Sequence, residues 1–383
     1  MKVILQKIVF TLACLVLAVF MSPIDLLASR ALLLHPNLAI GTSNDRLMDH
    51  TDWDTVNVFN GNLSVSVPLG ITYPLTPSFS YQFSVTYNSG IWDFDQTTFS
   101  ASPNKYFNAG LGWDLSFGKL VEPAASDNGL NRWIYISPDG TEHPFYDQLH
   151  VDVAEPAGDN VLYTRDGTYI RLSRVSSTVW QVQTPDGLIR TFTLNNGEWV
   201  LTKVGDRFSS YVQLDYSVNN VWTLTDNLGR QQKIYFKADP TGIYPRLVDH
   251  VTLTAFGSAT ATYTFNYTTS SISRPTFPGD PNTATTVLVP LLASITLPDG
   301  STEAYTYQPA GAAANSSGRL ATRQLPTLGK VQWTYQNYSF VSPNCSTSLV
   351  SVLRNTTGVA TRTLIDAGGA AQGSWALVPH LQT

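Results

Sequence analysis

Four aspartates in this 383-residue chain could carry chemistry, because paired carboxylates serve as acid and base in glycoside hydrolysis. Turn carboxylates can also ligate Ca²⁺. Each of the four, however, precedes a glycine where a tight turn favours an aspartate that bonds the backbone and a glycine that accepts a positive φ. No Asp-x-Asp-x-Asp-Gly loop or glycine-aspartate nonapeptide accompanies them. We therefore interpret them as turn residues, with neither a catalytic nor a calcium-binding role: Asp139, Asp166, Asp186 and Asp299.

The histidines and cysteines lack the spacing of a metal site or a nucleophilic site. No His-x-x-x-His or Glu-x-x-His pair occurs, so no zinc site is predicted. Cys345 has no base partner evident in the sequence, and we interpret it as inert. Gly-x-Ser-x-Gly, P-loop and Gly-x-Gly-x-x-Gly motifs are absent as well. We predict no catalytic, cofactor-binding or metal-binding residue, and this includes the six histidines: His35, His50, His143, His150, His250 and His380.

The elements that position these residues are β-hairpins, and the clearest one spans Trp180–Phe192. Its turn is Pro185-Asp186-Gly187, in which proline presets φ and glycine can take a positive φ. A three-residue loop of this kind fixes the register of the two strands. That register predicts Trp180 opposite Phe192, as an aromatic cross-strand pair on one face.

The same unit occurs earlier, at Trp133–Phe145, with tryptophan, turn and phenylalanine at identical offsets. Its register predicts Trp133 opposite Phe145, and His143 opposite Tyr135. Further turn markers follow at a spacing of about 20 residues, which is two ordinary strands for each turn. A tryptophan that recurs at a fixed place in a hairpin indicates a core position rather than an exposed sugar-stacking position. Repetition of this kind predicts a repeat architecture.

The composition agrees with strands rather than helices. Only 13% of the residues are charged and 43% are hydrophobic, and the chain has 9 Trp, 18 Tyr and 17 Phe. Aromatic and β-branched residues favour strands, and no segment shows a convincing helical period. The formal net charge of −5 comes with no basic patch, which argues against nucleic-acid binding.

Residues 1–28 have the features of a secretory signal peptide. Lys2 and Lys7 precede an apolar run, Ile8–Met21, and small residues near Ala28 offer a cleavage point. An uncleaved anchor helix is the alternative. Beyond this segment no apolar run is long enough to span a bilayer. We expect a secreted or cell-surface protein without an internal disulfide, because cleavage leaves Cys345 alone.

The region 55–122 is predicted to hold several strands after an irregular lead-in at 29–54. Asn60-Gly61 indicates a two-residue hairpin turn that places Val56 opposite Val65. Phe79–Tyr87 alternates strictly and predicts a half-buried strand. Asn88–Asn108 is predicted as a long loop whose Trp92 and Phe94 plug into a core. Gly110–Leu120 is predicted as a further strand.

The hairpin repeat covers 123–310, and 311–383 is predicted as an incomplete C-terminal β region. Ser270–Thr286 and Gly311–Gly318 are predicted loops or breaks, and Val331–Tyr335 and Gly373–Trp375 are predicted strands. A repeat array requires a polar capping unit. Because none is recognisable, we expect this chain to be part of something longer.

The sequence resembles the N-terminal part of a bacterial Rhs/YD-repeat protein over roughly 50–380. The Asp226-Asn-Leu-Gly-Arg230 spacing is similar to the second half of the family's repeat, although Tyr146-Asp147 is followed by no Gly-Arg. The order of several motifs carries the resemblance: Val56–Leu63, Leu111–Trp113, Ser137–Gly140, Asp206–Phe208, Asp226–Arg230 and Leu325–Gly329.

The resemblance implies a long β-ribbon that spirals into a hollow shell around a variable C-terminal toxin or adhesive domain. The motif that closes the shell is absent here, and so is the effector. We therefore expect an all-β protein of repeated antiparallel hairpins that forms a twisted ribbon and an open or partial shell. Its expected partner is a cargo domain, C-terminal or separately encoded.

The function that we predict is structural, with no catalytic activity: a scaffold or encapsulating shell segment for display or delivery. One alternative is a cell-surface module that binds carbohydrate or a protein. Another is a β-propeller enzyme, because Trp133 and Trp180 are 47 residues apart and propeller blades span about 40–50. The next copy at that period lacks the Pro-Asp-Gly turn, which argues against a propeller.

Overall fold

The computed structural model describes residues 48–51, 53–58, 60–95, 100–123, 132–138, 140–147, 160–275, 284–342 and 352–377. Within them the protein is all-β and built of antiparallel strands, as predicted, with no α-helix. None of their helices is long and apolar enough to cross a membrane. Several predicted features lie outside these residues: the signal segment 1–28, both cysteines, Asp139, His35, His150 and His380.

The N-terminal part forms a five-stranded sheet in the order β1-β2-β3-β4-β7, in which the β3–β4 hairpin is longest. Phe79–Tyr87 forms a strand, as its alternation predicts. One strand lies within 29–54, which was predicted to be irregular, and it pairs with the strand that follows. The strands are β1 Met48–His50, β2 Thr55–Asn57, β3 Leu63–Thr76, β4 Phe79–Asn88 and β7 Trp113–Asp114.

The β2–β3 hairpin differs from its prediction in register. Val56 lies opposite Leu63, not Val65, because the turn is longer than two residues. The Gly61 N–H donates to the Asn57 carbonyl at 2.6 Å. Gly61 in turn accepts a bond from the Val359 N–H at 2.9 Å, far along the chain. A tertiary contact therefore shapes this turn, whereas the expected two-residue turn rested on local signals alone.

The segment between β4 and the repeat also departs from expectation. The predicted loop Asn88–Asn108 contains a two-stranded ribbon, β5 Trp92–Asp95 with β6 Ser100–Pro103. Trp92 is buried in a second apolar cluster, as predicted. Gly110–Leu120 is not one strand. Gly110 and Gly112 have positive φ just before β7, and Gly118 has positive φ between β7 and the next strand, so the chain bends on both sides of β7.

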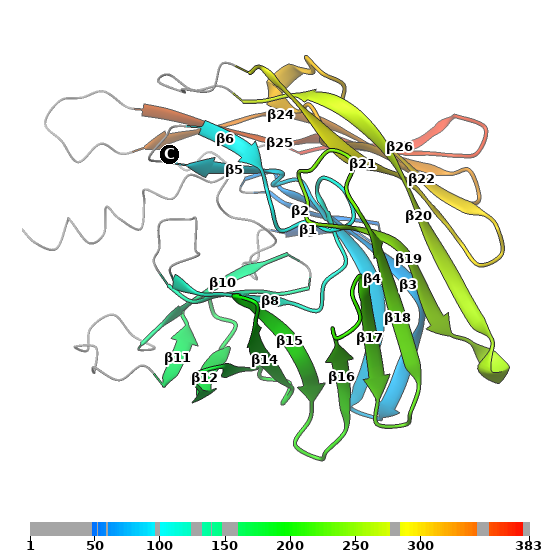
Figure 1. Ribbon diagram of the computed structural model, residues 1–383. Coiled ribbons are helices and arrows are strands. Elements are labelled where there is room, and N and C mark those ends of the chain that lie inside the picture. The colour runs from blue at the N-terminus through cyan, green and yellow to red at the C-terminus, as the bar shows by residue number, and fades with distance from the viewer. Residues whose placement is uncertain are drawn as a thin grey trace, which may run out of the picture.

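Eight strands, β8 to β15, form a ring (Figure 1). Each pairs with the next, and the ring closes where Trp199 of β15 lies opposite Leu120 of β8. The last three residues of β15, Lys203–Gly205, pair with β16, so the chain leaves the ring through this strand. The strands are β8 Lys119–Val121, β9 Ile134–Ile136, β10 Glu142–Tyr146, β11 Val161–Thr164, β12 Arg171–Ser176, β13 Val179–Gln183, β14 Ile189–Asn195 and β15 Glu198–Gly205.

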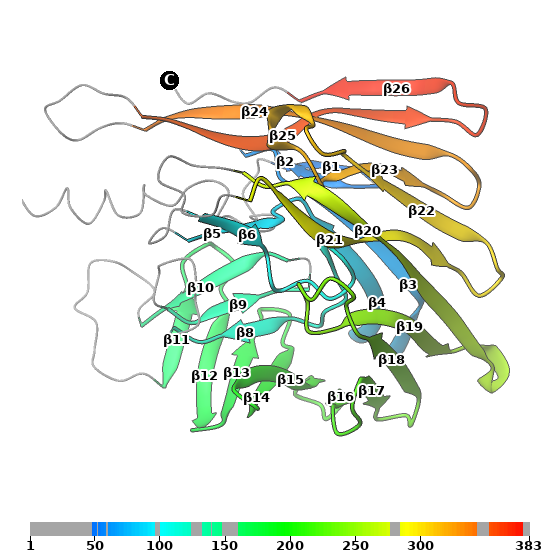
Figure 2. The same cartoon turned by 45° about the horizontal axis from the view of Figure 1, so that its top comes forward.

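From β16 the chain continues as a ribbon of successive antiparallel strands that ends at β26 (Figure 2). Ser270–Ser273, predicted as part of a loop, instead completes the long β20, and the connection begins at residue 274. Gly311–Gly318 is a loop, as predicted. The elements are β16 Tyr211–Asp215, β17 Val221–Asp226, β18 Gln231–Lys237, β19 Leu247–Thr254, η3 Phe256–Ser258, β20 Thr260–Ser273, β21 Thr286–Thr296, β22 Thr302–Tyr307, η4 Ala313–Asn315, β23 Leu320–Gln324, β24 Lys330–Ser342, β25 Val352–Ile365 and β26 Ala371–Ala376.

The hairpin registers of the ring agree with their predictions. Trp180 lies opposite Phe192, and His143 lies opposite Tyr135. The Phe145 N–H donates to the Trp133 carbonyl at 2.9 Å, which completes the second predicted pair. The prediction succeeds here because a Pro-Asp-Gly turn fixes register locally, within the residues of the hairpin itself.

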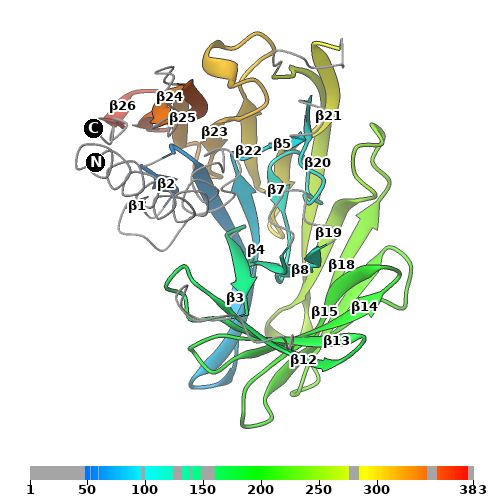
Figure 3. The same ribbon diagram turned by 90° about the vertical axis from the view of Figure 1, so that its left-hand side faces the viewer.

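The β3–β4 hairpin packs against the ribbon, which curves around it (Figure 3). Tyr81 of β4 donates to the Asp226 carboxylate at 2.9 Å, and Tyr73 of β3 donates to the Thr254 carbonyl at 2.7 Å. Tyr87 accepts the Leu320 N–H at 2.9 Å. These bonds join residues about 145 to 233 positions apart, so the N-terminal sheet and the ribbon share one core.

Candidate functional site

The described turn aspartates act as turn residues, which confirms their predicted structural role. In each, Oδ1 accepts the backbone N–H two residues further on: 3.0 Å from Thr168 to Asp166, and 3.0 Å from Leu188 to Asp186. Asp299 accepts the Ser301 N–H at 2.9 Å in the same way. The three carboxylates belong to three separate turns, and Asp139 lies outside the described residues.

Asp166 has a second partner, which brings a serine, a histidine and an aspartate together. Its Oδ2 lies 2.6 Å from His143 Nδ1, and His143 Nε2 lies 3.4 Å from Ser137 Oγ. Burial alone would raise the pKa of Asp166, but hydrogen bonds from His143 and Thr168 lower it to about 2. The arrangement has the order of a hydrolase relay, in which an aspartate orients a histidine beside a serine.

We interpret this array as part of the hairpin rather than as a nucleophilic site. The Ser137 hydroxyl donates to the Thr141 carbonyl at 3.2 Å, across its own turn. Thr184 makes the equivalent bond to the Leu188 carbonyl at 3.4 Å in the repeated hairpin, where no histidine is present. The serine therefore stands at a repeated turn position. His143 is buried and stacks on Tyr135, with ring centroids 5.9 Å apart.

His250 and the repeated tryptophans have structural surroundings. His250 Nδ1 lies 2.8 Å from Asp249 and its ring stacks on Tyr235 at 4.2 Å. Trp133 and Trp180 pack together at 4.8 Å as part of the ring core, as predicted. Within the described part of the chain, no group of three His, Cys, Asp or Glu residues is placed to hold a metal ion.

A cavity of about 380 Å³ lies where the ring closes and the ribbon begins. This volume is in the range of small-molecule pockets, which is roughly 300–1,000 Å³. Its walls come from β8, β15 and the segments beside β7, β17 and β19. Aromatic side chains form much of the lining: Tyr106, Phe107, Phe117, Trp199, Tyr216 and Trp222.

One cation on the cavity wall has no hydrogen-bonded partner in the part of the chain that the structure describes. Arg246 lies over Trp222 and Phe236, with its guanidinium carbon 5.0 and 4.8 Å from their ring centroids. Among the described residues it forms no ion pair or hydrogen bond. Burial lowers the pKa of Arg246, and the charge of Glu198 opposes that effect. The side chain is therefore a partly desolvated cation that presents donors beside an aromatic surface.

A second unpartnered donor, the indole N–H of Trp222, marks the same cavity in the described structure. The Trp222 Nε1 is buried. The Trp199 Nε1, by contrast, donates to Glu122 Oε2 at 3.2 Å, and Tyr216 donates to the Leu201 carbonyl at 2.6 Å. Trp222 and Arg246 thus provide unused donors among aromatic walls, which is the composition of a site for a polar organic ligand.

Sequence reasoning did not find this cavity. Its residues are separated by up to 141 positions, from Lys105 to Arg246, and they meet only because β8 pairs with β15. No motif marks that pairing, since it rests on a single opposed pair, Trp199 and Leu120. The available signal was the density of aromatic residues in these segments.

In comparisons with known proteins, the chain matches no protein-family model and no curated protein.

Proposed function

We propose that the chain is an exported structural scaffold, without catalytic activity of its own, that supports display or delivery. The resemblance to Rhs/YD-repeat proteins favours this role. The observation that carries the proposal is the growth of the ribbon strand by strand up to β26, whose pairings in the described structure are all with β25. The outer edge of β26 can accept a strand from a cargo or neighbouring segment.

The outer edge of β26 leads to a prediction for hydrogen exchange. The Leu377 N–H donates to the Ala360 carbonyl at 2.8 Å. Successive N–H groups of a strand point to opposite sides, so the Trp375 N–H also points toward β25, whereas the Ser374 and Ala376 N–H groups point outward. The outward amides should exchange rapidly in the purified chain and slowly in the native assembly isolated from its cells. The Trp375 amide, as the internal control, should be slow in both. Rapid exchange of the outward amides in the native assembly would contradict a scaffold that extends through this edge.

A second function, ligand binding, is favoured by the cavity beside Arg246. An arginine recognises a carboxylate through paired donors, and aromatic rings offer apolar faces against which a sugar ring can pack. We propose that this site binds an acidic saccharide. The proposal develops the predicted alternative of a carbohydrate-binding module and is compatible with a scaffold.

The saccharide proposal predicts a preference for acidic over neutral sugars. A disaccharide containing glucuronic acid should bind about 10-fold or more tightly than the neutral glucose disaccharide, because hydrogen bonds to charged groups contribute roughly 1.5–3 kcal/mol. Arg246→Met should abolish this preference, and Trp222→Phe should weaken binding of both sugars. Titration calorimetry provides the measurement.

The matched control for Arg246 is Arg207→Met. Arg207 also lies over an aromatic ring, that of Phe208 at 4.8 Å, but it is exposed and does not line the cavity. This variant should bind both disaccharides as the unmodified chain does. Equal affinity of the unmodified chain for the acidic and the neutral disaccharide, or no binding of either, would exclude an acidic saccharide as the ligand.

A further inference from the structure

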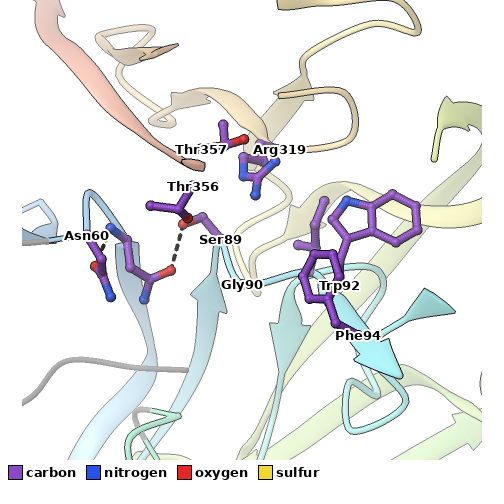
Figure 4. A pocket seen from close by; sticks show the side chains of 10 residues that line it. Asn60, Ser89, Gly90, Trp92, Phe94, Arg319, Thr356 and Thr357 are labelled. Carbon is purple, nitrogen blue, oxygen red and sulfur yellow. Dashed lines mark hydrogen bonds between the residues drawn. The ribbon is translucent and has the colours of Figure 1, made fainter. Parts of the chain in front are cut away.

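A smaller pocket, separate from the cavity at the ring closure, contains a buried cation. Arg319, between η4 and β23, is 6% exposed. Its Nη1 donates to the Asn315 carbonyl at 2.6 Å, while its Nε is buried and has no partner among the described residues. Figure 4 shows the guanidinium directed toward Gly90, between Ser89 and Trp92.

The charge of Arg319 is not balanced by a carboxylate in the described structure. Burial lowers the pKa of Arg319, and the groups that oppose this effect are Tyr87 and Tyr335. Burial also raises the pKa of Tyr87 to about 12 and that of Tyr335 well above its ordinary value. Both phenols are therefore neutral near pH 7. A buried arginine without an opposite charge is costly, by several kcal/mol, unless something else supplies that charge.

Arg323 is another buried arginine, and it has an acidic partner. It is also 6% exposed, and its Nε lies 2.5 Å from the Glu303 carboxylate. That pair satisfies the usual rule that buried charges are matched. Among the described residues Arg319 departs from this rule, although it lies only four positions earlier, immediately before the strand that contains Arg323.

The pocket beside Arg319 is lined by polar groups and has a second unpartnered donor. The Trp92 Nε1 is buried and has no partner in the described part of the chain. The free space in this partly open pocket is about 20 Å³, enough for about one sphere of water size. Its other polar walls come from three separate parts of the chain: Asn60, Asn62, Ser89, Thr356 and Thr357.

We propose that this pocket binds a small inorganic anion of chloride size. Such an ion would supply the charge that Arg319 lacks and would accept a hydrogen bond from an arginine or indole N–H. Because the pocket joins the β2–β3 turn, the β4–β5 connection and β25, the ion would link the N-terminal sheet to the end of the ribbon. The site is independent of the saccharide proposal and of the scaffold proposal.

A halide titration tests the proposal. At constant ionic strength, replacing sodium gluconate by sodium chloride or bromide should raise Tm in a saturable manner, because a ligand that binds only the folded state stabilises it. Crystals grown in bromide should show an anomalous peak between Arg319 and Trp92. Equal Tm in gluconate and halide, together with the absence of that peak, would overturn the proposal and leave water as the occupant.

Variants identify the donors. Arg319→Met should remove the halide-dependent rise in Tm. Trp92→Phe, which keeps an aromatic side chain but removes the indole N–H, should shift the halide midpoint to higher concentration. Arg323→Met is the matched control, because it removes a buried arginine that already has a carboxylate. It should lower Tm while preserving the halide-dependent rise. Should Arg319→Met fail to fold, the Trp92→Phe midpoint and the anomalous peak still decide.

Discussion

Replacing Asp54 by alanine is expected to destabilise the protein by about 3–5 kcal/mol, the cost of leaving a buried charge without its partner. The Asp54 side chain is fully buried, and its Oδ1 lies 2.8 Å from Arg362 Nη1. Its Oδ2 accepts the Trp333 indole N–H at 2.5 Å, and Oδ1 also accepts the Thr51 hydroxyl at 2.7 Å. The loss is a large part of the roughly 5–15 kcal/mol that stabilises a typical domain.

Urea unfolding followed by tryptophan fluorescence measures this effect as a shift in the midpoint. Lys237→Ala is the control, since Lys237 and Asp249 form an exposed pair at 3.0 Å that should contribute less than about 1 kcal/mol. The double variant Asp54→Ala with Arg362→Met should recover part of the loss, because it no longer leaves a buried charge uncompensated. An Asp54→Ala cost no greater than that of Lys237→Ala would show that this pair does not stabilise the fold.

Gly358→Ala is the second change for which we expect a large effect. An added Cβ at Gly358 would lie 2.6 Å from the Gly61 Cα and 2.4 Å from Tyr338 Cε2. Real Cβ atoms do not approach other atoms so closely, and one of these neighbours is backbone. The β2–β3 turn would have to separate from β25, at a cost of roughly 1–3 kcal/mol or more for overpacking.

Gly329→Ala is the matched control in the neighbouring hairpin. The nearest atoms to its added Cβ are the Ile365 carbonyl oxygen at 3.7 Å and Thr327 Oγ1 at 3.9 Å, which are ordinary contacts. This substitution should leave stability nearly unchanged or increase it slightly, by restricting the unfolded chain. Denaturant midpoints of the two variants should differ clearly. Equal midpoints would mean that the close contact between Gly61 and Gly358 does not constrain the fold.

The two variants test contacts that no local sequence pattern predicts. Asp54 bonds residues 279 and 308 positions away, and Gly61 meets Gly358 from the other end of the described chain. Asp54 lies in the stretch that was predicted to be an irregular lead-in. Its importance arises only when the N-terminal sheet is placed against β24 and β25.

Two hairpins of the ring, including their register, follow from local sequence alone. A Pro-Asp-Gly turn, an aspartate that bonds the N–H two residues on and alternating apolar residues act within about a dozen residues, so Trp180 meets Phe192 without help from the rest of the chain. The same reasoning identified the turn role of Asp166, Asp186 and Asp299. It could not predict sites formed by residues that are distant in sequence.

Tertiary packing sets the closure of the ring at β8 and β15, the longer turn at Gly61 and the placement of Arg246 and Arg319. Each depends on segments that meet after more than 75 intervening residues, as the opposed Leu120 and Trp199 do. Local propensity contains no information about such meetings, because they are set by how whole sheets pack and which buried groups they satisfy. The described turn aspartates, considered first as possible catalytic residues, therefore stabilise hairpin turns. The candidate binding sites lie where strands distant in sequence converge.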